Sequence, residues 1–147
     1  MLDRRFFSKI AINTVARYRK FIFDPDGGGK GAKQVDGKSY PTYTTGYSKA
    51  KKSAKIKRSD SKFSGSNAPV LTGDLYKDFQ GFKLISGGFS FGTPTQGAKV
   101  DHLSKLGRKI STNAKPLPDK VGKYIMDQAE KYVKQELGKI KSRTFNI

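Results

Sequence analysis

Residues 71–79, LTGDLYKDF, mark the change from a polar, basic part of the chain to its most strand-like part. Leu71, Leu75 and Phe79 recur every fourth residue, which is the spacing of one apolar stripe on a short helix. Thr72 stands where a residue that caps a helix N-terminus is expected. We therefore predict a short helix here, with Leu75 and Phe79 as its anchors on the core.

The residues that follow predict a small antiparallel sheet. Apolar and polar side chains alternate over residues 82–93, on both sides of the turn-forming triplet Ser86-Gly87-Gly88. A helical turn that ends at Gly107 is expected next, and then a further short strand over residues 108–111. The run KPLP at residues 115–118 predicts an extended entry to the next element, because each proline fixes its own φ and restricts the residue before it.

A long helix is predicted at each end of the chain. Residues 3–23 carry apolar side chains at helical spacing and are followed by the helix-breaking run DPDGGG. Residues 118–141 repeat the helical spacing, with Asp119 in the first turn and basic residues near the end, as the helix dipole favours. The residues expected to be buried are Leu75, Phe79, Phe89, Phe91, Ile125 and Val133.

Between the first helix and the sheet, residues 24–70 are polar and show no clear period, which predicts a long flexible arm. Its candidate interaction residues are Tyr40, Tyr43, Tyr47, Lys51, Lys52, Lys55, Lys57 and Arg58. Interleaved aromatic and basic side chains can stack on bases and hold phosphates. The alternative is an arm that becomes ordered only against a partner, and this alternative is the favoured one.

These elements predict a single α+β domain over residues 1–147. It consists of a helix at 1–23, an extended flexible arm at 24–70, and a core at 71–147 that ends in the second long helix. An antiparallel sheet is expected to pack against the two long helices.

The charge of the chain points to anionic partners. Thirty Lys and Arg residues stand against 12 Asp and Glu residues, which gives a net charge of +18 that attracts polyanions. The excess is spread along the whole chain, which favours a channel wall or acidic protein neighbours over one base-reading element. No apolar run is long enough to span a membrane, so no membrane partner is expected.

The sequence offers little for catalysis. It has no Cys and one His, His102, which cannot assemble a usual zinc site. The run GGGKG at residues 27–31 lacks the spacing and the Ser or Thr of a phosphate-binding loop. We therefore expect no catalytic, cofactor-binding or metal-binding residues, and a protein that is not an enzyme.

Several landmarks occur in an order that resembles the tail-completion and neck proteins of tailed bacteriophages, the phage virion morphogenesis family. The landmarks are an amphipathic N-terminal helix, DGKSYPTYTTGYSKAK, APVLTGDLYKDF, a hairpin ending in FGT, DHLSKLG, and KPLP before a C-terminal helix. In this resemblance Leu71-Thr72-Gly73 is the family's "LTG", the hinge between the arm and the core. KPLP lacks the arginine that is common before the second proline, so a role tied to that arginine does not carry over.

The resemblance implies a structural virion protein that forms a ring of identical subunits. Such a ring would join the portal or adaptor of the DNA-filled head to the tail proteins, with double-stranded DNA passing through its lumen and contacted non-specifically. It would be found in the neck of the virion, and in the host cytoplasm during assembly. The rival hypothesis is a free basic protein that binds nucleic acid, and it draws on the charge and on the Tyr/Lys arm.

Overall fold

The structure is a computed structural model that describes residues 4–52, 66–69, 74–79, 82–86, 88–92 and 97–144. Its elements, in chain order, are α1 (Arg4–Phe23), α2 (Thr45–Lys52), α3 (Asp74–Asp78), β1 (Phe82–Ile85), β2 (Gly88–Phe91), α4 (Gly97–Lys105) and α5 (Asp119–Thr144). β1 and β2 form an antiparallel hairpin in which Phe82 pairs with Phe91. The predicted α+β class, the hairpin and the two long terminal helices are confirmed.

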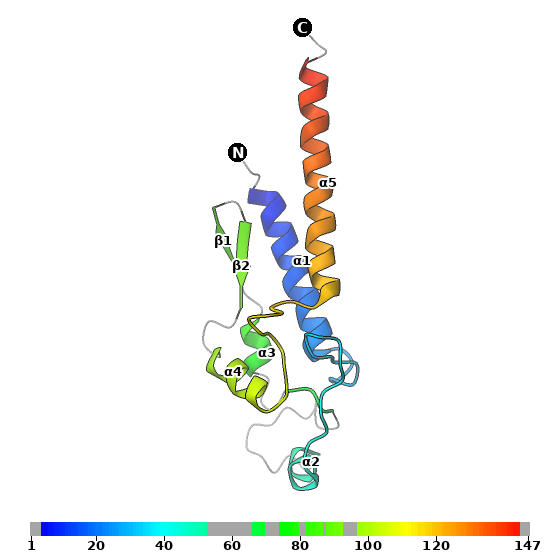
Figure 1. Cartoon of the computed structure of the whole chain (residues 1–147), viewed down its shortest axis with the longest axis vertical. Helices are drawn as coiled ribbons and strands as arrows, with labels where there is room; N and C mark the ends of the chain where they lie inside the picture. Colours follow the sequence, from blue (N-terminus) through cyan, green and yellow to red (C-terminus); the bar gives the residue numbers. More distant parts are fainter. Residues whose placement is uncertain are drawn as a thin grey trace.

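The molecule is elongated, and α1 runs along its centre (Figure 1). α5 packs beside α1, and the hairpin packs against α1 as well. α5 continues past the start of α1 at one end of the molecule, whereas α2 lies at the opposite end (Figure 1). The long axis therefore separates the C-terminal part of α5 from α2.

α1 ends where its sequence predicts, at the run DPDGGG. Asp24 takes a positive φ of 45° directly after the helix, a conformation that Asp tolerates better than most residues. Its carboxylate then accepts a hydrogen bond of 2.8 Å from the backbone N–H of Gly31. A Cβ at Gly27 would lie only 2.1 Å from that carboxylate, so any other residue there would displace the carboxylate. The loop is thus folded tightly back onto the end of α1.

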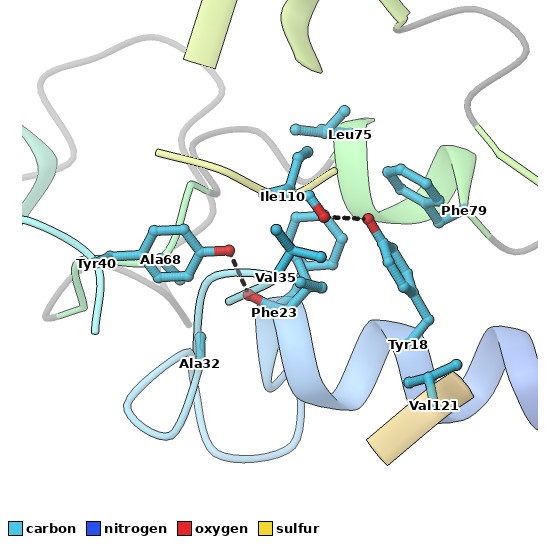
Figure 2. Close-up of a cluster of buried hydrophobic side chains, with 11 residues drawn as sticks. Tyr18, Phe23, Ala32, Val35, Tyr40, Ala68, Leu75, Phe79, Ile110 and Val121 are labelled. Carbon is cyan, nitrogen blue, oxygen red and sulfur yellow. Dashed lines mark hydrogen bonds between the residues drawn. The ribbon is translucent and has the colours of Figure 1, made fainter. Parts of the chain in front are cut away.

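The core lies around the second half of α1 (Figure 2). The ring of Phe79 contacts two aromatic rings of α1, with centroid distances of 4.9 Å to Tyr18 and 5.9 Å to Phe23. Leu75 and Phe79 are both buried, as predicted, so the short helix α3 does anchor the second half of the chain on α1. The other residues of the predicted hinge, Leu71-Thr72-Gly73, lie outside the described residues.

Two buried tyrosines of the core keep their hydroxyl groups hydrogen-bonded. The Tyr18 hydroxyl donates to the carbonyl of Ile110 over 2.7 Å, and the Tyr40 hydroxyl donates to the carbonyl of Ile22 over 3.1 Å (Figure 2). Each bond joins segments that are distant in sequence. Burial raises the pKa of both hydroxyl groups well above the usual tyrosine value. Both side chains therefore stay neutral donors over the physiological pH range.

The first part of the predicted arm differs from expectation, because it contributes to the core. Ala32, Val35 and Tyr40 are buried, and an isolated bridge pairs Lys33 with Ser39 across a turn at Gly37. These apolar residues are few and separated by polar ones, so the sequence shows neither the helical nor the strand spacing of apolar residues here. Residues 53–65 of the predicted arm lie outside the described residues.

The strand expected over residues 108–111 is not formed. Instead, the backbone N–H of Val35 donates to the carbonyl of Lys109 over 2.9 Å. The N–H of Lys109 in turn donates to the side-chain oxygen of Gln34, again over 2.9 Å. Since the second of these bonds uses a side chain, the two segments are joined at one point and no ladder develops. The prediction of a strand here was wrong.

The predicted burial is only partly confirmed. Phe89, Phe91 and Ile125 are half-buried, whereas Val133 is 54% exposed, so its prediction was wrong. Val133 lies about a third of a turn around α5 from the face that packs on α1. On that packed face the ring of Phe6, in the first turns of α1, stacks on Tyr132 with a centroid distance of 4.1 Å. α1 therefore ends its contact with α5 near Tyr132, and α5 runs on beyond it (Figure 1).

Candidate functional site at the base of the basic segment

The most basic stretch of the chain is residues 45–65, here called the basic segment. It carries seven Lys and Arg residues and one Asp. The segment begins as α2, whose sequence TGYSKAKK contains three lysines and no acidic residue. α2 lies at one end of the molecule (Figure 1), so its charge is presented away from α5.

Both ends of the basic segment are fixed to each other next to the core. Tyr43 precedes the segment, and its hydroxyl donates a hydrogen bond of 3.1 Å to the carbonyl of Ala68, which follows the segment. Ala68 is itself a buried member of the core cluster (Figure 2). The chain just before the segment, at Tyr43, is therefore joined to the chain just after it, at Ala68, which closes the base of the segment.

Arg108 strengthens this closure and was not predicted from the sequence. Its guanidinium carbon lies 3.7 Å from the centroid of the Tyr43 ring, which is a cation–π contact. One guanidinium nitrogen also donates a hydrogen bond of 2.9 Å to the carbonyl of Asn67. Arg108 is only 6% exposed, so both contacts are largely shielded from water. A single buried cation thus holds the chain before and after the basic segment.

The end of α4 places Arg108 in this position. Gly107 follows α4 with a positive φ of 77°, which glycine adopts without steric cost. The N–H of Arg108 then donates to the carbonyl of Leu103 over 2.8 Å, which closes the C-terminus of the helix. The predicted helix stop at Gly107 is confirmed, and its consequence is to turn Arg108 inward. A Gly-Arg pair after a helix was visible in the sequence, but nothing in it identified Tyr43 as the partner.

The three predicted interaction tyrosines have different surroundings. Tyr40 is buried in the core, so its ring is not available for stacking on a base. Tyr43 is half-buried under Arg108, and burial raises its pKa while the Arg108 charge opposes that rise. Tyr47, in α2, lies 4.6 Å from Tyr43 between ring centroids. Tyr43 and Tyr47 therefore lie at the base of the basic segment, whereas Tyr40 belongs to the core.

The predicted basic residues are described in part. Lys51 and Lys52 belong to α2, although their side chains are not described. Lys49, which was not among the predicted residues, is exposed on the same helix. Lys55, Lys57 and Arg58 lie outside the described residues. The described part of the site is therefore a tyrosine–arginine base with exposed positive charge next to it. Such charge binds phosphates or carboxylates through Coulomb attraction, and this attraction carries no base sequence information.

The remaining described residues offer no second site with catalytic or metal-binding chemistry. His102 is exposed on α4, and within the described ranges no three His, Cys, Asp or Glu residues gather as a metal site would require. A hollow of about 670 Å³ lies between α1, the hairpin and α4, and its lining is mostly aromatic and aliphatic. Among the described helices, none has the length and apolar character needed to cross a membrane.

Comparisons of the chain with protein-family models, with curated proteins and with solved structures found no match.

Proposed function

We propose that this protein is a structural component of the virion of a tailed bacteriophage. In this proposal it is a tail-completion or neck protein that forms a ring of identical subunits between the head and the tail. The ring contacts the portal or adaptor on one side and tail proteins on the other, and the genome passes through its lumen. The protein acts by binding and not as an enzyme.

One observation supports this proposal above the others: two exposed helical elements lie at opposite ends of the long axis of the molecule. The lysine-bearing helix α2 lies at one end, and the C-terminal part of α5 lies at the other (Figure 1). A subunit that joins two assemblies needs separate surfaces for them, whereas a free binding protein needs only one. The order of the sequence landmarks, from the N-terminal helix to KPLP, points to the same family.

The closed base of the basic segment fits a role in assembly. Tyr43 and Arg108 join the chain on the two sides of the segment, so the two points where it meets the core are fixed. Fixed attachment points lower the entropy that a partner's binding costs. The positive charge then suits DNA phosphates in a lumen or acidic surfaces of adjoining proteins.

The second candidate, a free nucleic-acid-binding protein, is favoured by the net charge of +18 and by the same basic segment. The position of Tyr40 argues against binding by stacking of this ring on a base, because the ring lies in the core. The two candidates differ in what happens when the basic segment is neutralised. A neck protein loses particle assembly, whereas a free binding protein loses affinity for nucleic acid.

The test uses one variant in the genome that encodes this chain and in the purified protein. The variant changes four lysines of the basic segment to glutamine: Lys51, Lys52, Lys55 and Lys57. Its control changes four exposed lysines elsewhere to glutamine, with the same change in net charge: Lys9, Lys20, Lys38 and Lys83.

For the neck role we expect filled heads without attached tails for the first variant and normal particles for the control, as counted by electron microscopy. Loss of the gene should give the same filled, tailless heads. Normal joining of heads to tails, together with tight and sequence-selective duplex binding by the isolated monomer at physiological salt, would overturn the proposal in favour of the second candidate. The salt slope of any duplex binding should fall by about one unit for each phosphate contact that is lost.

A further inference from the structure

The side of the α1–α5 pair that faces away from the hairpin carries two pairs of lysines. On α1 these are Lys9 and Lys20, and on α5 they are Lys120 and Lys131; all four are exposed. Each pair is separated by 11 residues, which is close to three full turns, so both members lie on the same side of their helix. This set is called the four-lysine face below.

The order of residues around α1 places its two lysines away from the hairpin. Phe7 lines the hollow beside the hairpin, and Phe6 and Arg17 contact α5. Lys20 and Lys9 follow next around the helix, nearly half a turn from Phe7. The contact with α5 therefore lies between the hollow on one side and the lysines on the other.

The same order is repeated around α5. Ile125 lines the hollow, and Tyr132 and Tyr124 contact α1. The two lysines of α5 follow next, at least about a third of a turn from Ile125. The lysines of both helices thus flank the seam between α1 and α5 on the side opposite the hollow.

The register of the two helices brings the lysines level with one another along this seam. α1 and α5 run in opposite directions (Figure 1), with Phe6 stacked on Tyr132 at 4.1 Å. Counting from this contact and from that of Arg17 with α5, Lys9 lies within about two residues of the level of Lys131.

The same count places Lys20 within about two residues of the level of Lys120. The lysines therefore form two crosswise pairs, roughly 16 Å apart along the helices. Packed helix axes lie about 8–10 Å apart, so the four positive charges border a compact area.

The four-lysine face keeps an excess of positive charge. α1 has six Lys and Arg residues and no acidic residue. Arg17 adds its charge at the seam, where its guanidinium lies 4.2 Å from the centroid of the Tyr124 ring. On α5, Asp127 is the acidic residue nearest to the two lysines around the helix, whereas Glu130 is bound by Lys134 over 2.7 Å. The four lysines, Arg17 and Asp127 together give a net charge of 5 − 1 = +4.

The residues between the lysines suit phosphates better than a protein surface. Asn13 and Ala16 of α1 and Gln128 of α5 lie there. Among the described residues, the large apolar side chain closest to this area is Ile12, which lies at the outer edge of α1, farther from α5 than Lys9. Protein interfaces are apolar at their centre and poor in lysine, whereas Lys, Arg, Asn and Gln are the side chains that contact phosphate oxygens.

The aromatic rings at the seam are engaged within the protein. Tyr132 is stacked on Phe6, and Tyr124 lies under Arg17. Proteins that bind single strands use free aromatic rings on which the bases stack. A duplex keeps its bases stacked inside and presents phosphates outward, so it fits a face that offers charge and amide groups.

From this geometry we infer that the four-lysine face binds the phosphate backbone of duplex DNA without reading its sequence. Over roughly 16 Å a duplex carries about nine phosphate charges, which is enough to meet the four lysines and Arg17. The place of this face in a particle rests on the proposed function, in which it would line the lumen of the ring. The binding itself is a property of one copy of the chain.

The test measures binding of the full-length protein to two labelled duplexes of unrelated sequence. Fluorescence anisotropy is followed from about 50 to 200 mM salt, because the slope of log K against log salt reports the number of phosphate contacts. The face variant changes four lysines to glutamine: Lys9, Lys20, Lys120 and Lys131. Its control changes four other exposed lysines to glutamine, with the same change in net charge: Lys38, Lys83, Lys99 and Lys105.

We expect the native protein and the control to bind both duplexes with similar affinity and a similar salt slope. The face variant should bind at least about tenfold more weakly, with a slope lower by about 3–4 units, because four phosphate contacts are lost. Lys120→Gln/Lys131→Gln alone should lower the slope by about two units. Circular-dichroism melts check that the variants fold, as expected for changes at exposed positions.

Three outcomes would overturn the inference. Equal losses in the face variant and its control would show that net charge alone explains the binding. A larger loss on changing Lys51, Lys52, Lys55 and Lys57 to glutamine would place the duplex on the basic segment. Binding of a polyglutamate peptide that is lost in the face variant, without binding of either duplex, would assign the face to an acidic protein.

The results also separate this inference from the neck role. In the genome, the face variant should leave heads joined to tails, since joining is assigned to the basic segment. Unchanged duplex binding by the face variant would overturn the inference and leave the neck role standing. Normal particles in the absence of the gene would overturn the neck role and leave the measured duplex binding standing.

Discussion

The clearest prediction concerns Arg108, because one substitution tests the closure of the basic segment. The substitution Arg108→Met keeps most of the length and apolar stem of the side chain but removes the guanidinium. Two contacts are lost: the one to the Tyr43 ring at 3.7 Å and the hydrogen bond of 2.9 Å to the carbonyl of Asn67. We expect the free energy of unfolding to fall, and the chain around residues 66–69 to lose its attachment.

The magnitude follows from these two contacts. A cation–π contact shielded from water contributes about 2 kcal/mol, and a hydrogen bond from a charged donor contributes about 1.5–3 kcal/mol. Burial of the methionine offsets part of the loss, since it adds about 1–2 kcal/mol of apolar stabilisation. The expected net loss in the free energy of unfolding is therefore about 1.5–4 kcal/mol.

Urea denaturation at neutral pH measures this loss, and Lys109→Met is the matched control. Lys109 is exposed, and its backbone hydrogen bonds do not involve its side chain. Both variants lower the net charge equally, so relief of general repulsion cancels in the comparison. A loss for Arg108→Met within about 0.5 kcal/mol of the Lys109 value would refute the reasoning, because it lies in the range of ordinary surface substitutions.

A double-mutant cycle then assigns the energy to the ring contact. Tyr43→Leu removes the aromatic ring and the hydroxyl, and the cycle with Arg108→Met isolates the coupling between the two side chains. We expect a coupling of about 1–2 kcal/mol in favour of the native pair. In hydrogen-exchange measurements, Arg108→Met should increase the exchange rate of the Ala68 amide more than the rates of amides at the buried end of α1. Independent effects of the two substitutions would show that the ring and the guanidinium do not stabilise one another.

Three further substitutions test the core. Phe79→Ala should lower the free energy of unfolding in urea by about 3–5 kcal/mol, because the ring is buried against those of Tyr18 and Phe23. A loss below about 1 kcal/mol would mean that α3 does not anchor the chain on α1. Burial raises the pKa of Tyr18 and Tyr40 in the folded protein, so with rising pH the unfolded state loses these protons first. The free energy of unfolding should therefore be unaffected by these tyrosines below pH 10.0, their usual pKa, and should fall above it. The slope should be up to about 1.4 kcal/mol per pH unit for each tyrosine, and the Tyr18→Phe/Tyr40→Phe variant should lack it. Within the described chain, the buried Thr14 hydroxyl has no hydrogen-bond partner. Thr14→Val should therefore raise the free energy of unfolding by about 1 kcal/mol, and with it the melting temperature. A lower melting temperature would indicate a partner for the hydroxyl.

Local pattern was sufficient to predict most of the helices and the hairpin. The long helices at both ends were evident from apolar spacing, and their ends followed from Asp24 with its glycine run and from Pro118. The hairpin followed from alternation on both sides of a glycine turn, and the α4 stop followed from Gly107. These features depend on residues that are close together in sequence, where backbone geometry and side-chain spacing act directly.

The tertiary structure alone decided which apolar residues are covered and which polar ones are buried. Val35 and Tyr40 enter the core through contacts with Lys109 and Ile22, which no local pattern in residues 24–70 reveals. Val133 is apolar but exposed, because it lies about a third of a turn around α5 from the face on which α1 packs.

The candidate site shows the same division between sequence and structure. The sequence located the basic residues and the tyrosines, since composition is local. It did not indicate that Arg108, 65 residues after Tyr43, closes the base of the segment. Spacing within one element constrains only the faces of that element. Contacts between elements depend on how helices of different length pack together, and that is fixed only when the whole chain has folded.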